Sequence, residues 1–237
     1  MKVAIFGHPR SGSTLLYRFY EHDFPEECRL GEIFNPSEYT ELFVNASNKL
    51  ELLQMPQSKR LHLFTDINDV QNRQERFDLV EKVKPNDMYI KIVPHDLDYP
   101  PILDYISNFD EVICIERKDL FDTILSGIIS MNTWVFNVEQ NEEKPKCEPF
   151  NASRSEFLFM EESIQKYFNY KNVLKNVITK TYVYEEFIKD EFAKNNFQKL
   201  STLEQKRNIV KNWKEVYDWW ENSWLYGCIE NNTFKGE

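Results

Sequence analysis

Residues 3–16 of the chain read VAIFGHPRSGSTLL, and this stretch decides the fold that the sequence predicts. The apolar run at 3–6 is typical of a central strand that is covered on both faces. A helix then begins near Ser13, after a loop bounded by Gly7 and Gly12. Because glycine permits backbone conformations that a Cβ atom resists, successive N–H groups of such a loop can surround one anion. The stretch therefore predicts a P-loop, an anion-binding loop between a strand and a helix.

This loop differs at one position from the P-loop that hydrolyses nucleoside triphosphates. Gly7, Gly12 and Thr14 fit the pattern G-x-x-x-x-G-K-[ST], but the lysine position holds serine. That lysine reaches the β- and γ-phosphates of a triphosphate, so a smaller phosphate-like group is favoured here. The cation stands earlier, at Arg10, and a turn that binds no ligand is the alternative interpretation. The hydroxyl donors of the loop are Ser11, Ser13 and Thr14.

A second segment, EVICIERKDLFDTILSG at 111–127, also carries polar residues after an apolar run. The run at 112–115 predicts a buried strand, and a helix follows directly. Arg117 and Lys118 therefore come at the carboxyl end of the strand, where open parallel sheets bind ligands. Ser126 follows two turns along the helix. Taken alone, these basic residues could simply follow a strand without a ligand.

The string PRSGSTLL at 9–16 resembles the 5′-phosphosulfate-binding loop of sulfotransferases that use 3′-phosphoadenosine-5′-phosphosulfate (PAPS). These enzymes hold the 3′-phosphate with an arginine just after a strand and a serine eight positions later. Ser126 is eight positions after Lys118 and nine after Arg117, so both basic residues are candidates. The resemblance implies that PAPS, and its product PAP, would be bound by Arg10, Ser11, Gly12, Ser13, Thr14, Arg117, Lys118 and Ser126.

Further segments resemble other parts of the same family. Several branches carry a Gly-Glu pair like Gly31-Glu32, which implies that Glu32 is the general base; a surface glutamate in a turn is the alternative. The segment MYIKIVPH at 88–95 resembles one that lies beside the acceptor, with Lys91 in a strand and His95 after it. Cytosolic relatives use a histidine base, so His95 is the second candidate, although such a histidine is more often structural. The catalytic candidates are Glu32, Arg10, His95 and Lys91.

Near the C-terminus the resemblance continues more weakly. Residues 184–187, YEEF, look like the family's Y-E-D-L motif, which is expected to be architectural. Asn212–Glu215 resembles an N-[WY]-x-E segment that follows basic residues near the cofactor, and here Lys206 and Arg207 precede it.

Strand and helix patterns alternate along the whole chain. They predict one α/β domain over 1–237, with a central, mostly parallel sheet of about five strands flanked by helices, as in P-loop NTPases. A polar, proline-containing stretch at 136–152 predicts an exposed loop. The strands are expected near 2–6, 61–65, 89–93, 111–116 and 177–182, and the helices near 13–22, 69–84, 118–131, 154–174, 184–194 and 203–221.

Composition narrows the classes of partner. The chain has 237 residues and a net charge of −10, which argues against nucleic acid and against a heparin-like acceptor. No stretch reaches the roughly 20 apolar residues of a membrane span. Met1-Lys2 leads directly into the first strand, which predicts no targeting segment and a cytoplasmic protein. The four cysteines have no metal-binding spacing, so no metal is expected.

The resemblance implies an enzyme that transfers a sulfuryl group from PAPS to a hydroxyl or amine of a small-molecule or glycan acceptor. One alternative is a P-loop kinase or NTPase with a degenerate loop, for which Glu116 would be the magnesium-binding acid. The other alternative is a non-catalytic nucleotide-binding module of the same fold.

Overall fold

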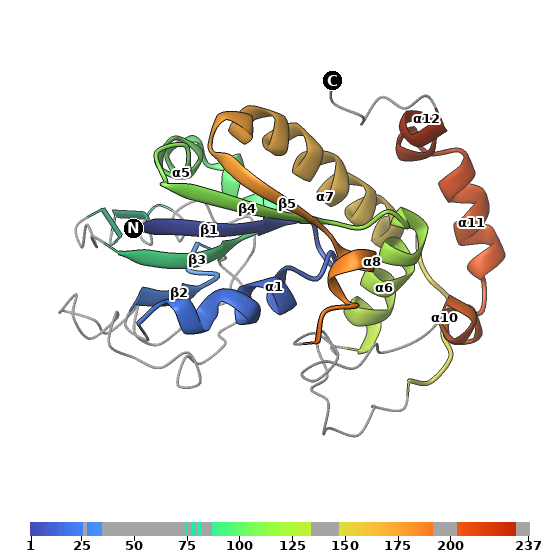
Figure 1. The fold of residues 1–237 in the computed structure, drawn as a ribbon. Helices are drawn as coiled ribbons and strands as arrows, with labels where there is room; N and C mark the ends of the chain where they lie inside the picture. Colours follow the sequence, from blue (N-terminus) through green and yellow to red (C-terminus); the bar gives the residue numbers. More distant parts are fainter. Residues whose placement is uncertain are drawn as a thin grey trace.

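In the computed structural model, five parallel strands form one sheet with the order β2-β3-β1-β4-β5 (Figure 1). The strands are β1 (Lys2–Gly7), β2 (Arg29–Gly31), β3 (Met88–Ile92), β4 (Glu111–Glu116) and β5 (Ile178–Val183). The structure describes residues 1–25, 28–34, 74, 77–78, 80–81, 87–133, 147–191 and 203–230.

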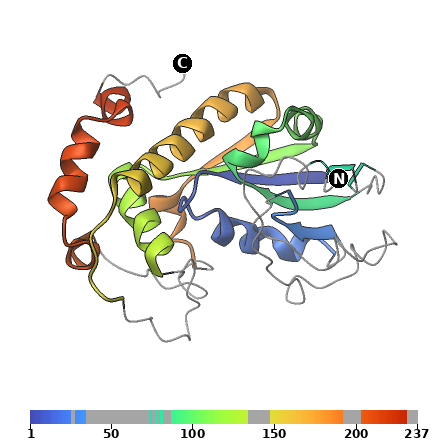
Figure 2. The ribbon, with the colours of Figure 1, turned by 180° about the vertical axis from the view of Figure 1, so that it is seen from behind.

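Helices cover both faces of this sheet, as the long apolar runs of its strands require. Ala4 and Phe6 of β1 face the helices α5 (Pro100–Ile106) and α7 (Arg154–Val173). Val3 and Ile5 point the other way and pack against α1 (Ser13–Tyr20). Figures 1 and 2 show α1 on one side of the sheet and α5 and α7 on the other.

A second apolar cluster lies beyond the carboxyl end of β4. It joins α6 (Leu120–Thr133) and α7 to the C-terminal helices α10 (Leu203–Ile209), α11 (Trp213–Glu221) and α12 (Trp224–Glu230) (Figure 2). Its fully buried members include Ile124, Phe157, Val216 and Leu225. The remaining short helices are η1 (Glu21–Asp23), η4 (Pro94–Asp98), η5 (Leu174–Asn176) and α8 (Tyr184–Phe187).

The predicted architecture, an α/β fold with five parallel strands between helices, is confirmed. The five strands are not the five expected, because β2 forms from residues for which no strand was predicted. The expected strand at 61–65 and most of the expected helix at 69–84 lie outside the described residues. The likeness to P-loop NTPases, and the single domain, stay predictions.

The expected helix at 203–221 is divided in two, and a contact with a distant segment explains the break. Val210 forms a parallel bridge with Phe150, whose N–H donates to Ile209 O at 2.9 Å. Lys211 N–H returns a hydrogen bond to Phe150 O at 2.8 Å. Residues 136–146 of the expected loop lie outside the described part of the chain, whereas its end is fixed at Phe150 and at the buried Ala152.

The strand order makes the carboxyl end of β1 a switch point, where the connections to later strands leave toward opposite sides of the sheet. After β1 the chain continues to β2 and β3 on one side, whereas after β4 it continues to β5 on the other. In open α/β sheets, ligands bind outside the carboxyl ends of the strands at such a point. This is where the loop between β1 and α1, predicted to be a P-loop, and the Arg117 segment both lie. Within the described residues, no helix is long and apolar enough to span a membrane.

Candidate functional site

The backbone of the predicted P-loop is tightly wound. Ser11 N–H donates to His8 O at 3.0 Å, and Gly12 lies in the left-handed region at φ 96°. Arg10 also has a positive φ, 64°, and is the one non-glycine residue of the described chain that does. This conformation costs a residue with a Cβ about 1–2 kcal/mol. Backbone strain of this kind concentrates at ligand sites, so the loop is a candidate site on geometry alone.

Arg10 reaches from the loop to the residue predicted as its partner in cofactor binding. Its Nε donates to Ser126 Oγ, on α6, at 3.4 Å. Burial and, as a smaller cause, the nearby charge of Arg117 lower the pKa of Arg10 to about 10. The guanidinium is still protonated at neutral pH. Two cations therefore lie beside each other at the ends of β1 and β4, where an anion would relieve their repulsion.

Arg117 is held by two neighbours and keeps one donor for a ligand. Its Nη1 donates to Asp122 Oδ2 at 3.1 Å, and its guanidinium lies 3.9 Å from the ring centroid of Tyr184. Its Nε is buried and has no hydrogen-bond partner among the described residues, and the same is true of Ser11 Oγ. Because buried donors are rarely left unsatisfied, these two atoms indicate where an oxyanion could bind.

Tyr184 joins the P-loop to Arg117, a role that the sequence did not indicate. A Cβ atom on Gly12 would lie 2.5 Å from the Tyr184 ring, so glycine is what allows this packing. The next residue, Glu185, accepts a hydrogen bond from Lys118 N–H at 3.1 Å and so holds the β4–α6 connection. The YEEF segment is thus architectural, as expected, but its tyrosine also belongs to the site.

The structure distinguishes the two basic candidates after β4. The Lys118 side chain is 66% exposed and pairs with Glu186 at 2.8 Å. The Arg117 side chain is 10% exposed and lies next to Arg10. Arg117 is therefore the residue that is brought together with Arg10 and Ser126.

Glu32 and Lys91 meet on the other flank of the P-loop. Glu32 follows β2, Lys91 lies on β3, and their side chains form an ion pair that is about one-tenth exposed. Lys91 Nζ also donates to Thr14 Oγ1 at 2.9 Å. The surface-glutamate alternative is wrong, because the Glu32 side chain is enclosed beside the loop. Three residues predicted from separate segments thus form one group.

His95 lies in a different environment. Its Nε2 is 2.9 Å from Ser163 Oγ on α7, and its ring stacks on Phe159 of the same helix. Its Nδ1 is 3.5 Å from Asp98. Burial alone would raise the pKa of Asp98, but hydrogen bonds from His95, Lys166 and Tyr170 hold it below its usual range. No contact of the described residues brings His95 together with Glu32 or Arg10.

His8, which the sequence did not single out, connects the two loops of the site. The side chain is fully buried, and burial lowers its pKa to about 4. The ring is therefore neutral, with Nδ1 3.0 Å from Pro9 O and Nε2 accepting from Arg117 N–H at 3.4 Å. Its place inside the quoted loop is the only sequence signal that could have indicated it.

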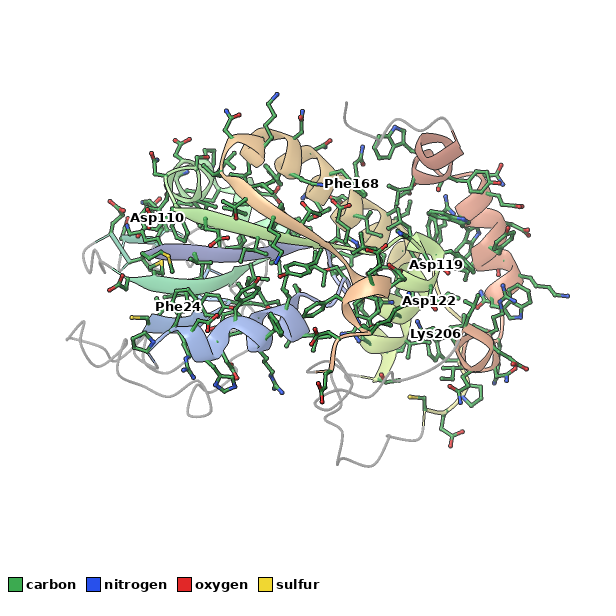
Figure 3. All side chains as sticks on the ribbon, viewed as in Figure 1. Phe24, Asp110, Asp119, Asp122, Phe168 and Lys206 are labelled. Atoms are coloured by element: carbon green, nitrogen blue, oxygen red, sulfur yellow. The ribbon has the colours of Figure 1, made fainter. Side chains whose placement is uncertain are left out.

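Lys206 was expected near the cofactor, whereas its partner Asp122 was not predicted. Asp122, on α6, accepts from Lys206 Nζ at 2.7 Å through Oδ1 and from Arg117 through Oδ2 (Figure 3). Arg117 and Lys206 thus share one carboxylate, and Arg10 lies near Arg117. These cations come together in a chain whose net charge is −10.

Glu116, the acid considered for magnesium, pairs with Lys171 and accepts from Tyr167 Oη at 3.2 Å. No cluster of three His, Cys, Asp or Glu side chains suited to a metal occurs in the described ranges. Neither a scan against protein-family models nor a search of curated proteins found a match to this chain.

Proposed function

We propose that the chain is a PAPS-dependent sulfotransferase that acts on a hydroxyl or amine of a small-molecule or glycan acceptor. The observation that carries the proposal is the meeting of Arg10 and Arg117 with Ser126 at the switch point of the sheet. Two cations suit a ligand with more than one anionic group, as do Ser11 Oγ and Arg117 Nε, two buried donors with no hydrogen-bond partner among the described residues.

In this proposal the cationic residues divide between two phosphates. Arg10 and the N–H groups of the loop stabilise the charge that develops on the departing 5′-phosphate, because such preorganised donors act most strongly in a buried site. Arg117 and Ser126 hold the 3′-phosphate, which supplies binding energy away from the reacting atoms. Bound PAPS would supply the sulfuryl group.

The chemical step needs a base and an in-line approach. Glu32 takes the proton from the acceptor while the acceptor oxygen or nitrogen forms a bond to sulfur. The bond between sulfur and the 5′-phosphate oxygen breaks, and its electron pair leaves with PAP. Lys91 connects Glu32 to Thr14, and it therefore positions the base beside the loop that holds the leaving phosphate.

Thermal unfolding with ligands tests the proposal. We expect adenosine 3′,5′-bisphosphate at 100 times its Kd to stabilise the protein by about 2.7 kcal/mol, visible as a raised Tm. Arg117→Ala should lose most of this shift, because it removes a cation next to Arg10. Lys118→Ala is the matched control, since that side chain is exposed and paired with Glu186.

Two outcomes would contradict the assignment. Stabilisation by ATP with Mg²⁺ alone would favour a kinase or NTPase. Binding of the bisphosphate without sulfuryl transfer from PAPS to any of a broad set of hydroxyl and amine acceptors would favour a non-catalytic module.

A further inference from the structure

A buried lysine lies behind the anion site. The Lys206 side chain is 4% exposed, which is rare for lysine unless the ammonium is paired. Its Nζ lies 2.7 Å from Asp122 Oδ1 and 3.2 Å from the main-chain oxygen of the same residue. Figure 3 labels the two side chains, which come from the neighbouring helices α10 and α6. Lys206 therefore contacts the first turn of α6 rather than solvent.

Asp122 divides its two carboxylate oxygens between two cations. Oδ1 accepts from Lys206 and Oδ2 accepts from Arg117 Nη1, at 3.1 Å. A buried carboxylate that faced Arg117 alone would cancel its charge. Because Lys206 offsets the same carboxylate, Arg117 is oriented by Asp122 and still carries a net attraction for an anion.

The position of Lys206 is itself fixed from outside the site. The residues after α10 pair with the segment before α7 through the bridge between Val210 and Phe150. Asn212 then accepts from Ala152 N–H at 2.8 Å and donates to Ala152 O at 3.0 Å. These contacts hold the end of α10 against the segment before α7, and Lys206 itself joins α10 to Asp122 of α6.

We infer that Lys206 is a positioning residue for the anion site and that it acts through Asp122 to keep Arg117 oriented and electropositive. This inference rests on the proposed function for the identity of the ligand, but an anion of any kind would depend on the same pair. Lys206 is not assigned a direct contact with the ligand.

Isothermal titration of the full chain with adenosine 3′,5′-bisphosphate, and separately with inorganic phosphate, tests the inference. In Lys206→Met the carboxylate of Asp122 would neutralise Arg117, and we expect at least about fivefold weaker binding of both probes. The double variant Asp122→Asn with Lys206→Met removes both charges but leaves an amide oxygen to accept from Arg117. Its affinity should return to within about twofold of the unsubstituted protein.

A purely structural role for Lys206 would give a different pattern. If α10 were merely loosened, the double variant would bind as weakly as Lys206→Met, and that result would overturn the inference. Equal binding by Lys206→Met and the unsubstituted protein would overturn it as well. Should Lys206→Met fail to fold by circular dichroism, Lys206→Gln takes its place, because its amide can still donate to Asp122 without the charge. Lys211→Met, an exposed lysine in the same segment, should bind normally.

The two probes separate this inference from the proposed function. If the unsubstituted protein binds phosphate but not the bisphosphate, and the variants follow the expected order with phosphate, the positioning role stands and the sulfotransferase proposal fails. If it binds neither probe, both are overturned.

Discussion

At the scale of single residues, the side chains that would perform the chemistry are enclosed and already connected to the P-loop. One ammonium, Lys91 Nζ, contacts both Glu32 and Thr14, so the candidate base is fixed relative to the loop before a ligand arrives. His95, the other candidate, is fixed instead to α7 through Ser163 and Phe159. Geometry therefore favours Glu32 as the base, which is a more specific expectation than the sequence allowed.

Replacing Glu32 by glutamine should abolish transfer and preserve the fold. The amide has the shape of the carboxylate and can accept from Lys91, but it cannot take the acceptor's proton. We expect turnover to fall by about 10²–10⁴-fold, the usual contribution of a general base. The measurement is PAP release from PAPS with a panel of hydroxyl and amine acceptors, alongside the urea midpoint of unfolding.

Glu186→Gln is the matched control, because this glutamate is 63% exposed and pairs across the surface with Lys118. It should turn over normally. If Glu32→Gln kept turnover within about threefold of the unsubstituted protein, Glu32 would not be the base.

At the scale of elements, the contact between the loop after β1 and α8 leaves no room for an added methyl group. Gly12→Ala would place a Cβ 2.5 Å from the Tyr184 ring, at a φ of 96° that alanine disfavours. Together these effects should destabilise the fold by about 2–4 kcal/mol, and displacement of Tyr184 should also disturb Arg117. Urea unfolding measures the first effect, and bisphosphate binding measures the second.

Gly227→Ala provides the comparison, since a Cβ there meets no heavy atom within 4 Å. In α12 alanine should be neutral or stabilising, by about 0.5–1 kcal/mol. Equal stability of Gly12→Ala and Gly227→Ala would show that the loop can move away from Tyr184, and the close packing would then not be required.

The same elements show what sequence patterns can and cannot predict. The central strands were predictable because their apolar runs are buried on both faces of the sheet. The edge strand β2 has three residues, too few for any periodicity to be visible. The break between α10 and α11 depends on the pairing of Val210 with Phe150. These residues are far apart in the sequence, so no local pattern indicates their contact.

The residues of the candidate site also include some that the sequence could predict and some that it could not. Arg10, Ser126 and Arg117 were predictable because they follow strands whose ends must meet at one edge of the sheet. Tyr184 enters through packing on Gly12, and Asp122 through pairing with a lysine 84 positions later in the chain. Such partners have no local pattern, because the three-dimensional contact alone selects them.

At the scale of the whole molecule, the charge at the candidate site is opposite in sign to the net charge of the chain. The chain has a net charge of −10, yet Arg10 and Arg117 lie near each other at the ends of β1 and β4, and Lys206 of α10 pairs with the carboxylate that Arg117 contacts. A negative net charge disfavours association with large polyanions, whereas neighbouring cations at one site can still attract a small anion. The overall charge therefore restricts the class of ligand, and the local cations favour an anionic one.

The stability of the whole fold should depend on pH through His8, which joins the ends of the central strands. Its pKa is about 4 in the folded protein, against 6.5 for an ordinary histidine, because burial disfavours the charged ring. The stabilisation is therefore complete above pH 6.5 and is lost as the pH falls toward 4, by about 3 kcal/mol in total. In His8→Asn this part of the pH dependence should disappear, although the variant is less stable at neutral pH. Urea midpoints at pH 7.5 and 4.5 measure it. His22→Asn, at an exposed histidine, is the control and should keep the pH dependence of the unsubstituted protein. If His8→Asn also kept that dependence, the neutral His8 ring would not be its source.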